Sequence, residues 1–206
     1  TLLHFKDHQM KSVDTYLEQL DCKMKVHQCA FNDFKGRIHY EDQHISTDKF
    51  QGRIGRSDFL LDLYWYTGKD PQLRKKDHYI HLVSDRLDIN QLLEWEIPTN
   101  EVDTIEKVDH DAGFSVFNLP FWEMQFKAEV GELTYHQYKI KDMDVGIRMT
   151  EERYIHIDTC TMEIADGQFD IKGYFNASDS NEIYFSPDFY AEGLDIDKFM
   201  VKFDNF

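Results

Sequence analysis

Apolar and polar residues alternate with a period of two along most of the chain, as in strands that have one apolar face. In the first half, Phe59, Leu61, Leu63 and Trp65 fall on one face of such a strand. The second half carries the alternation through Phe126, Ala128, Val130, Leu133, Tyr135, Met143, Val145, Ile147, Met149, Ile155, Ile157, Met162, Ile164, Phe169, Ile171, Gly173 and Phe175. Turn residues interrupt this series about every ten positions, which predicts short antiparallel strands joined as a meander.

The first 21 residues have a different spacing. Met10, Val13, Leu17 and Leu20 recur at intervals of three and four residues, with charged residues between them. This spacing is typical of an amphipathic helix. We therefore expect a short helical lead-in over residues 1–21.

The rest of the chain divides into two related β units, 22–95 and 120–206, separated by an acidic linker or loop over 96–119. Residues 54–65 (Ile-Gly-Arg-Ser-Asp-Phe-Leu-Leu-Asp-Leu-Tyr-Trp) align with residues 164–175 (Ile-Ala-Asp-Gly-Gln-Phe-Asp-Ile-Lys-Gly-Tyr-Phe). A Leu-Asp-Ile element follows each segment, at 87–89 and at 194–196. Similarity at a near-constant spacing is the signature of repeated supersecondary units.

Composition narrows the function classes. The chain has 206 residues, a formal net charge of −16 and a sequence pI near 4.9. This acidity excludes nucleic acid and anionic bilayer surfaces as direct electrostatic partners. No apolar run reaches the length of a membrane span. Because the chain begins at Thr1 without a methionine, we expect it to be part of a longer protein.

Residues with catalytic or metal-binding chemistry do not form a recognised motif. The histidine pairs His4/His8 and His78/His81 lack a companion ligand set. Cys22, Cys29 and Cys160 show no framework spacing, which leaves a Cys22–Cys29 disulfide open. No nucleophile elbow or phosphate-binding glycine loop occurs. We expect no enzyme, no catalytic residue, no cofactor and no metal. A hydrolase with an acidic active site remains an alternative interpretation, although no specific group of acidic residues indicates such a site.

The apolar strand faces allow two interpretations. They can form the core of a closed β-sandwich, which would act as a protein-interaction or adhesion module. Alternatively they can line a concave apolar surface that holds a hydrophobic ligand such as a lipid acyl chain. The expected lining residues occupy equivalent positions of the two units: Phe59, Leu61, Leu63 and Trp65, with Phe169, Ile171 and Phe175. Their polar neighbours Asp62, Asp170 and Lys172 are expected to face water.

The segment 126–175 carries Phe-Lys-Ala-Glu-Val-Gly-Glu-Leu-Thr-Tyr, then Ile-Lys-Asp-Met-Asp-Val, then Ala-Asp-Gly-Gln-Phe-Asp-Ile-Lys-Gly. This succession resembles the C-terminal region of AsmA-like proteins. Residues 54–59 and 87–93 are similar to the preceding repeat in Bacteroidota-type members of that family. The resemblance covers residues 22–206 without the 96–112 stretch. The turn Ala165-Asp166-Gly167 departs from the commoner small-Gly-Gly form.

The resemblance implies an elongated, strongly curved antiparallel sheet, all-β in class, that forms a taco-like groove as in bridge-like lipid-transfer proteins. It implies a periplasmic protein anchored in the inner membrane through an N-terminal helix that is missing here. The implied partners are phospholipid acyl chains, with outer-membrane or other envelope proteins. The implied task is non-enzymatic transport of phospholipid between inner and outer membranes, or outer-membrane homeostasis.

Overall fold

The computed structural model describes residues 1–6, 9–23, 29–70, 72–73, 78–93, 122–136, 138–179 and 182–200. Its strands are β1 (Leu2–Lys6), β2 (Gln9–Lys23), β3 (Ala30–Glu41), β4 (His44–Ile54), β5 (Ser57–Tyr66), β6 (His78–Asp88), β7 (Met124–Tyr135), β8 (Tyr138–Met149), β9 (Tyr154–Ile164), β10 (Gly167–Asp179) and β11 (Glu182–Glu192). Two helices of five residues each, α1 (Ile89–Leu93) and α2 (Ile196–Met200), follow β6 and β11.

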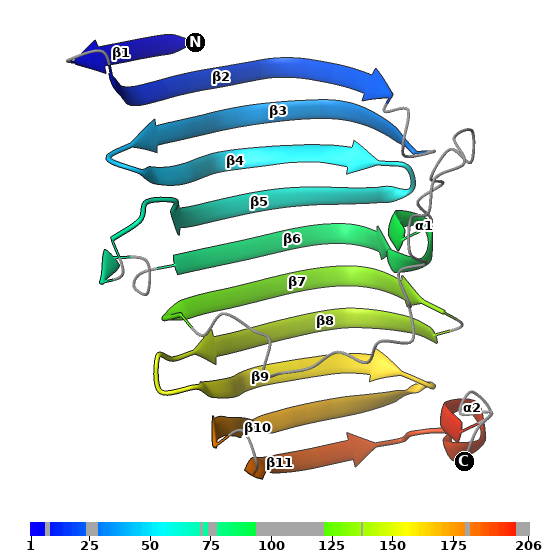
Figure 1. Cartoon of the computed structure of the whole chain (residues 1–206). Helices are drawn as coiled ribbons and strands as arrows, with labels where there is room; N and C mark the ends of the chain where they lie inside the picture. Colours follow the sequence, from blue (N-terminus) through cyan, green and yellow to red (C-terminus); the bar gives the residue numbers. More distant parts are fainter. Residues whose placement is uncertain are drawn as a thin grey trace, which may run out of the picture.

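All eleven strands form one sheet in chain order (Figure 1). Neighbouring strands pair antiparallel, except β6 and β7, which pair parallel from His78↔Met124 to Asp88↔Thr134. The all-β, predominantly antiparallel prediction is therefore confirmed. The closed β-sandwich is wrong for the described residues, because their strands belong to one sheet and not to two.

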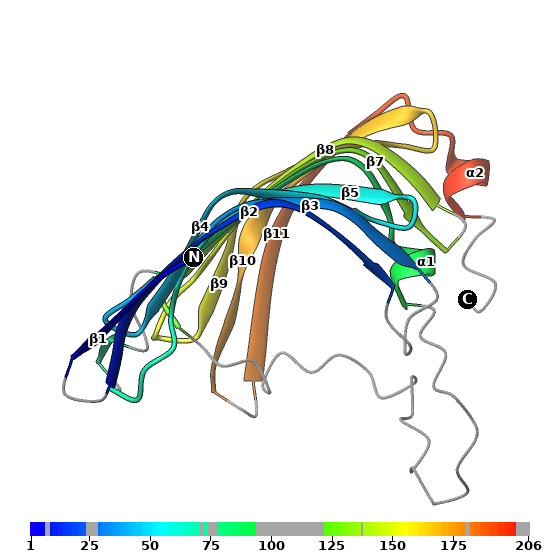
Figure 2. The same cartoon turned by 90° about the horizontal axis from the view of Figure 1, so that it is seen from above.

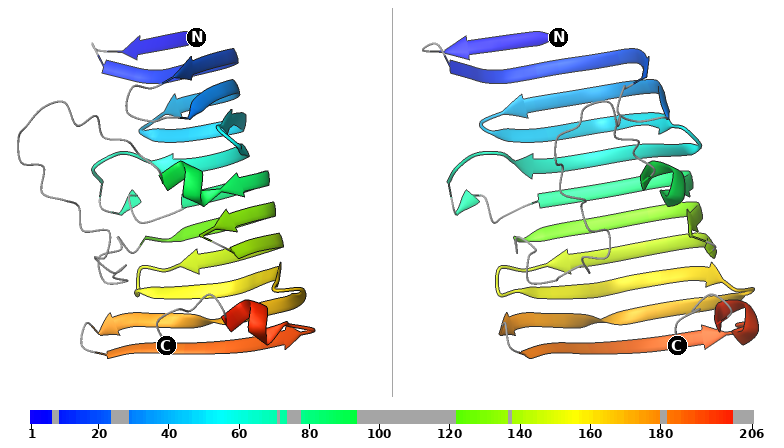
Figure 3. Two further views of the ribbon diagram at one scale, coloured as in Figure 1. Left: turned by 90° about the vertical axis from the view of Figure 1, so that its right-hand side faces the viewer. Right: turned by 45° about the vertical axis from the view of Figure 1, so that its right-hand side comes forward.

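The sheet is strongly arched, as predicted, and its strands bend together over the arch (Figure 2). Seen from the side, the strands follow one another as a single layer (Figure 3). Both helices lie on the concave side, next to the same ends of the strands (Figures 1 and 2).

The expected N-terminal helix is wrong: residues 2–6 and 9–23 form β1 and β2. Val13 pairs with Tyr40 and Leu17 with Gly36, and then the register shifts before Leu20 pairs with Phe34. Three residues of β2 therefore advance against two of β3, as in a β-bulge, which returns Leu17 and Leu20 to the same face. The interval of three between Leu17 and Leu20, which contributed to the helical pattern, comes from this irregularity.

The two related segments form matching hairpins. Ile54 pairs with Ser57 across the β4–β5 turn, and Ile164 pairs with Gly167 across the β9–β10 turn. The register beyond each turn also matches: Leu63 pairs with Ile80 and Gly173 pairs with Pro187. Ile80 and Pro187 are equivalent, because each lies seven residues before its Leu-Asp-Ile element.

Each Leu-Asp-Ile element starts one of the two helices. The Asp88 carboxylate accepts a hydrogen bond from the Gln91 backbone N–H at 3.0 Å, and Asp195 accepts one from the Lys198 N–H at 3.0 Å. An aspartate in this position caps a helix N-terminus. The repeated sequence thus produces a repeated joint, in which a strand ends and a capped helix turn begins.

Three other expectations have different outcomes. Residues 96–119, the expected linker, lie outside the described residues. The division at 22–95 and 120–206 stays an interpretation, since β1 to β11 are one continuous sheet. The question of a Cys22–Cys29 disulfide is answered in the described structure, where Cys22, Cys29 and Cys160 form none.

Candidate functional site: the concave apolar face

Apolar side chains form rows that cross the sheet from strand to strand. Residues paired across neighbouring strands point to the same face, so the strand register defines each row. One row passes through Leu63, Ile80, Phe126, Ile147, Ile157, Gly173 and Pro187. The next passes through Phe50, Leu61, Leu82, Ala128, Val145 and Cys160. At about 4.8 Å per strand, the first row extends about 29 Å across β5 to β11.

This apolar face is the concave one. The Phe199 ring of α2 lies 6.3 Å from the Phe169 ring, which belongs to the apolar face. Since α2 lies on the concave side of the arch (Figure 2), the apolar rows line that side.

Few of these side chains are fully buried. Among the described residues, the buried hydrophobic ones are Cys29, Tyr66, Ala128, Val130 and Ala177. The remaining apolar side chains of the rows are half-buried, because each contacts its neighbours within the layer and no second described layer covers them. A single-layer sheet with one apolar face presents a contiguous surface of the kind that usually marks a binding site.

The structure brings the seven predicted lining residues onto this face. Phe59, Leu61, Leu63 and Trp65 are half-buried on β5, and Phe169, Ile171 and Phe175 are half-buried on β10. The two sets are separated by β6 to β9, whose rows of apolar residues connect them. Gly173 takes the position that corresponds to Leu63, so no side chain projects from the apolar face at that point.

Aromatic rings reinforce both ends of the face. Phe59 lies 5.3 Å from Phe34 and 5.9 Å from Phe50 between ring centroids. On β10, Phe175 stacks on Phe185 of β11 at 4.0 Å. Such pairs add stability beyond the apolar area that they bury.

Two tryptophans and a histidine form a cluster that the sequence pattern did not predict. His78 is 2% exposed and lies 4.3 Å from Trp65 and 5.2 Å from Trp122 between ring centroids. Its Nδ1 accepts a long hydrogen bond, 3.4 Å, from the Tyr66 N–H. The alternation His78, Ile80, Leu82 could have placed this histidine on the apolar face.

Four methionines lie on the apolar face of the central strands β7, β8 and β9. Met124 pairs with Met149 across β7 and β8, and Met143 and Met162 lie on the same face of β8 and β9. Unbranched thioether side chains adapt to ligands of varied shape. This part of the surface can therefore fit flexible apolar chains.

The opposite, convex face is polar and contains the charges. Asp62, Asp170 and Lys172 lie there as predicted; Lys172 is exposed and the two aspartates are half-buried. Arg148 forms a bidentate pair with Asp158 at 2.5 and 2.8 Å, which lowers the pKa of that carboxyl and raises the pKa of the guanidinium. Glu129 accepts from Lys127 at 2.6 Å and lies 3.1 Å from His81, so its pKa is lowered.

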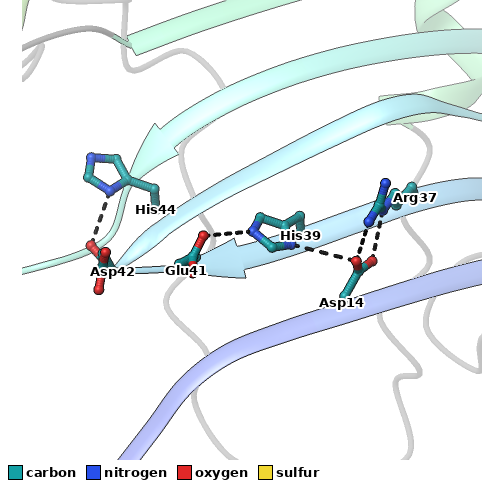
Figure 4. Close-up of polar contacts among 6 residues, drawn as sticks. All are labelled: Asp14, Arg37, His39, Glu41, Asp42 and His44. Atoms are coloured by element: carbon teal, nitrogen blue, oxygen red, sulfur yellow. Dashed lines mark hydrogen bonds and ion pairs between the residues drawn. The ribbon is translucent and has the colours of Figure 1, made fainter. Parts of the chain in front are cut away.

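A further polar cluster joins β2 and β3. Figure 4 shows Asp14 between Arg37 and His39, with Glu41 on the far side of the imidazole. The hydrogen bond from Arg37 lowers the pKa of Asp14. These contacts pair the charges across strands, which stabilises the polar face.

The described residues offer no arrangement for metal chemistry. His78 and His81 lie on opposite faces, and no group of three or more His, Cys, Asp or Glu side chains converges in the described part. Burial raises the pKa of the Cys160 thiol, which stands within an apolar row. Within the described ranges, no helix has the length and hydropathy of a transmembrane span.

Comparisons with known proteins leave the family open. No protein-family model, curated protein or solved structure matches this chain.

Proposed function

We propose that this chain holds lipid acyl chains on the concave apolar face of its sheet, as part of a non-enzymatic, AsmA-like envelope protein that carries phospholipid. The observation that carries the proposal is the pair of apolar rows that cross the sheet, one over seven strands and the other over six. They are half-exposed and have no second layer of described strands opposite. An apolar surface of this extent favours a partner that covers it.

The charge distribution supports a lipid as the ligand. The apolar rows lack charged side chains, whereas the convex face carries the ion pairs of Arg148, Lys127 and Arg37. Burying an unpaired charge against acyl chains would be costly, so a lipid-holding face must be free of such charges. The resemblance to AsmA-like proteins supports the wider setting. We propose a periplasmic location, an inner-membrane anchor outside this chain, and transport between the two membranes.

A matched pair of photo-crosslinking positions tests where the lipid lies. Phe175 and Tyr174 are adjacent aromatic residues on β10 that face the concave and convex sides, respectively. With p-benzoylphenylalanine at either position, we expect phospholipid crosslinks from Phe175 and few from Tyr174. Equal labelling at both positions, or none at either, would contradict the proposal.

A matched pair of substitutions tests whether the apolar face is required. Leu60 and Leu61 are neighbouring half-buried leucines on opposite faces of β5. Leu61→Asp should remove co-purified lipid, measured by extraction and native mass spectrometry, while Leu60→Asp should retain it. Ile171→Asp repeats the test in the second unit.

Circular dichroism must show that the tested variants keep their strands. If the concave variants unfold and the convex variant does not, these positions act as structural core, and the lipid proposal fails at this face. If folded Leu61→Asp protein retains its lipid, the proposal fails as well.

A further inference from the structure

The outer edge of β11 corresponds to the edge of β6 that pairs with β7 in the same sheet. The matching register of the two hairpins makes β11 the counterpart of β6, with Phe185, Pro187 and Phe189 standing where β6 has His78, Ile80 and Leu82. β6 receives β7 as a parallel neighbour over ten residue pairs. In the described structure, β11 pairs with β10 alone.

The exposure of side chains reflects this difference. His78 on β6 is 2% exposed, whereas its counterpart Phe185 is 44% exposed, and Phe189 is 59% exposed. Tyr190, on the convex side of the same strand, is also more than half exposed. Large aromatic side chains and unpaired backbone groups on one edge form a template for an added strand.

The helix after each strand adds a second point of correspondence. Asn90 of α1 holds the β7–β8 turn through two hydrogen bonds: its Nδ2 donates to the His136 carbonyl at 2.7 Å, and its Oδ1 accepts from the His136 N–H at 2.6 Å. Asp197 of α2 stands at the equivalent position and is exposed. A carboxylate there can accept from a backbone N–H as Asn90 does.

Charge sets the kind of strand that fits. On the convex side of β6, His81 and Arg86 lie 3.1 Å from Glu129 and Glu132 of β7. On β11 the counterpart of His81 is Asp188, whereas the counterpart of Arg86 is Gly193, which carries no charge. Lys127 of β7 pairs directly with His81, so a strand beside β11 needs a cation at that position and a second one where β7 has Glu129.

We propose that the outer edge of β11, together with Asp197, docks a β-hairpin of a partner protein. The first strand of that hairpin runs parallel to β11, places apolar side chains on the concave face and Lys or Arg on the convex face, and brings its turn to Asp197. Pro187 lacks a backbone N–H, so the hydrogen bonds to the added strand come from the residues of β11 on either side of Pro187. The docked hairpin extends the apolar face by two strands.

A peptide with the sequence of residues 122–150, the hairpin that pairs with β6, serves as the probe. Its Glu129→Lys form should bind the full chain and slow hydrogen exchange of β11 amides. The unaltered peptide should bind at least tenfold more weakly, and raised salt should reduce the difference. Fluorescence anisotropy of labelled peptide gives the affinities.

A charge swap provides the matched control. Asp188→Lys protein should prefer the unaltered, acidic peptide, and Asp197→Ala should weaken binding of both peptides. Because Asp188 and Asp197 are exposed, these variants should keep the fold. The proposal is overturned if neither peptide binds, if protection falls on strands other than β11, or if preference does not reverse in Asp188→Lys. Concentration-dependent self-association that protects β11 without peptide would also overturn the assignment to a separate partner.

Discussion

The β9–β10 turn contains a residue that should be replaceable with a gain in stability. Ala165 and Asp166 form a two-residue loop with φ angles of 48° and 63°. Positive φ at both positions is the mark of a type I′ turn, which glycine adopts most easily. We therefore expect Ala165→Gly to stabilise the protein.

The magnitude follows from two opposing terms. Left-handed backbone costs a non-glycine residue about 1–2 kcal/mol, and glycine removes that cost. The more flexible unfolded chain of the glycine variant offsets about 0.4–1 kcal/mol of it. The net expected gain is about 0.5–1 kcal/mol. The backbone contact at this residue, Asp195 N–H to Ala165 carbonyl at 2.9 Å, does not involve the side chain and should persist.

The equivalent turn of the first unit supplies the opposite control. Gly55 has φ of 58°, and a Cβ there would lie 2.3 Å from Gln91 Oε1 and 2.9 Å from Cys29 Sγ. Gln91 Oε1 accepts the Arg56 backbone N–H at 2.7 Å. Gly55→Ala should therefore lose about 2 kcal/mol, from backbone strain and a disturbed hydrogen bond.

Urea unfolding followed by far-ultraviolet circular dichroism measures both changes as shifts of the midpoint at unchanged slope. A destabilised Ala165→Gly variant would refute the turn assignment. An unchanged Gly55→Ala variant would refute the close packing of α1 against the β4–β5 turn.

Three further predictions concern other contacts. Asp88→Ala should destabilise the protein by about 2 kcal/mol in urea unfolding, and Asp195→Ala should destabilise it by less. The Asp88 side chain is 9% exposed and that of Asp195 is 38% exposed, so equal losses would contradict this ranking. Val130→Ala should lower the free energy of unfolding by about 1.6 kcal/mol, because it removes two methyl groups from a side chain that is 2% exposed. A loss below about 0.5 kcal/mol would indicate that solvent reaches this side chain. The Asp158 carboxyl has a lowered pKa in the folded protein, so its ion pair with Arg148 stabilises the fold at pH values above the usual carboxyl pKa. This contribution disappears as the pH falls through the folded-state pKa. Arg148→Gln should flatten that part of the stability–pH curve, and an unchanged curve would show that the ion pair does not contribute to stability.

The strand content and the lining residues followed from local pattern. A period of two specifies which side chains share a face, so Phe59 to Trp65 and Phe169 to Phe175 could be assigned to one surface without coordinates. The repeat also predicted equivalent positions, and the structure pairs Leu63 and Gly173 with corresponding residues of β6 and β11.

Long-range pairing explains what the pattern could not predict. The spacing of Leu17 and Leu20 looked helical because a register shift against β3 inserts a residue, and a bulge is defined only by both strands. The cluster of His78, Trp65 and Trp122 likewise depends on the parallel pairing of β6 and β7, which brings together residues far apart in the chain.

The sequence by itself predicted most of the strands after residue 22, their apolar and polar faces, and the repetition of the turn and of the Leu-Asp-Ile element, because each depends on residues a few positions apart. The tertiary structure alone decided that the strands form one arched sheet and not two packed ones, with the apolar rows on the concave side. Alternation is the same in both arrangements, since it states that a face is apolar and does not state what lies against it.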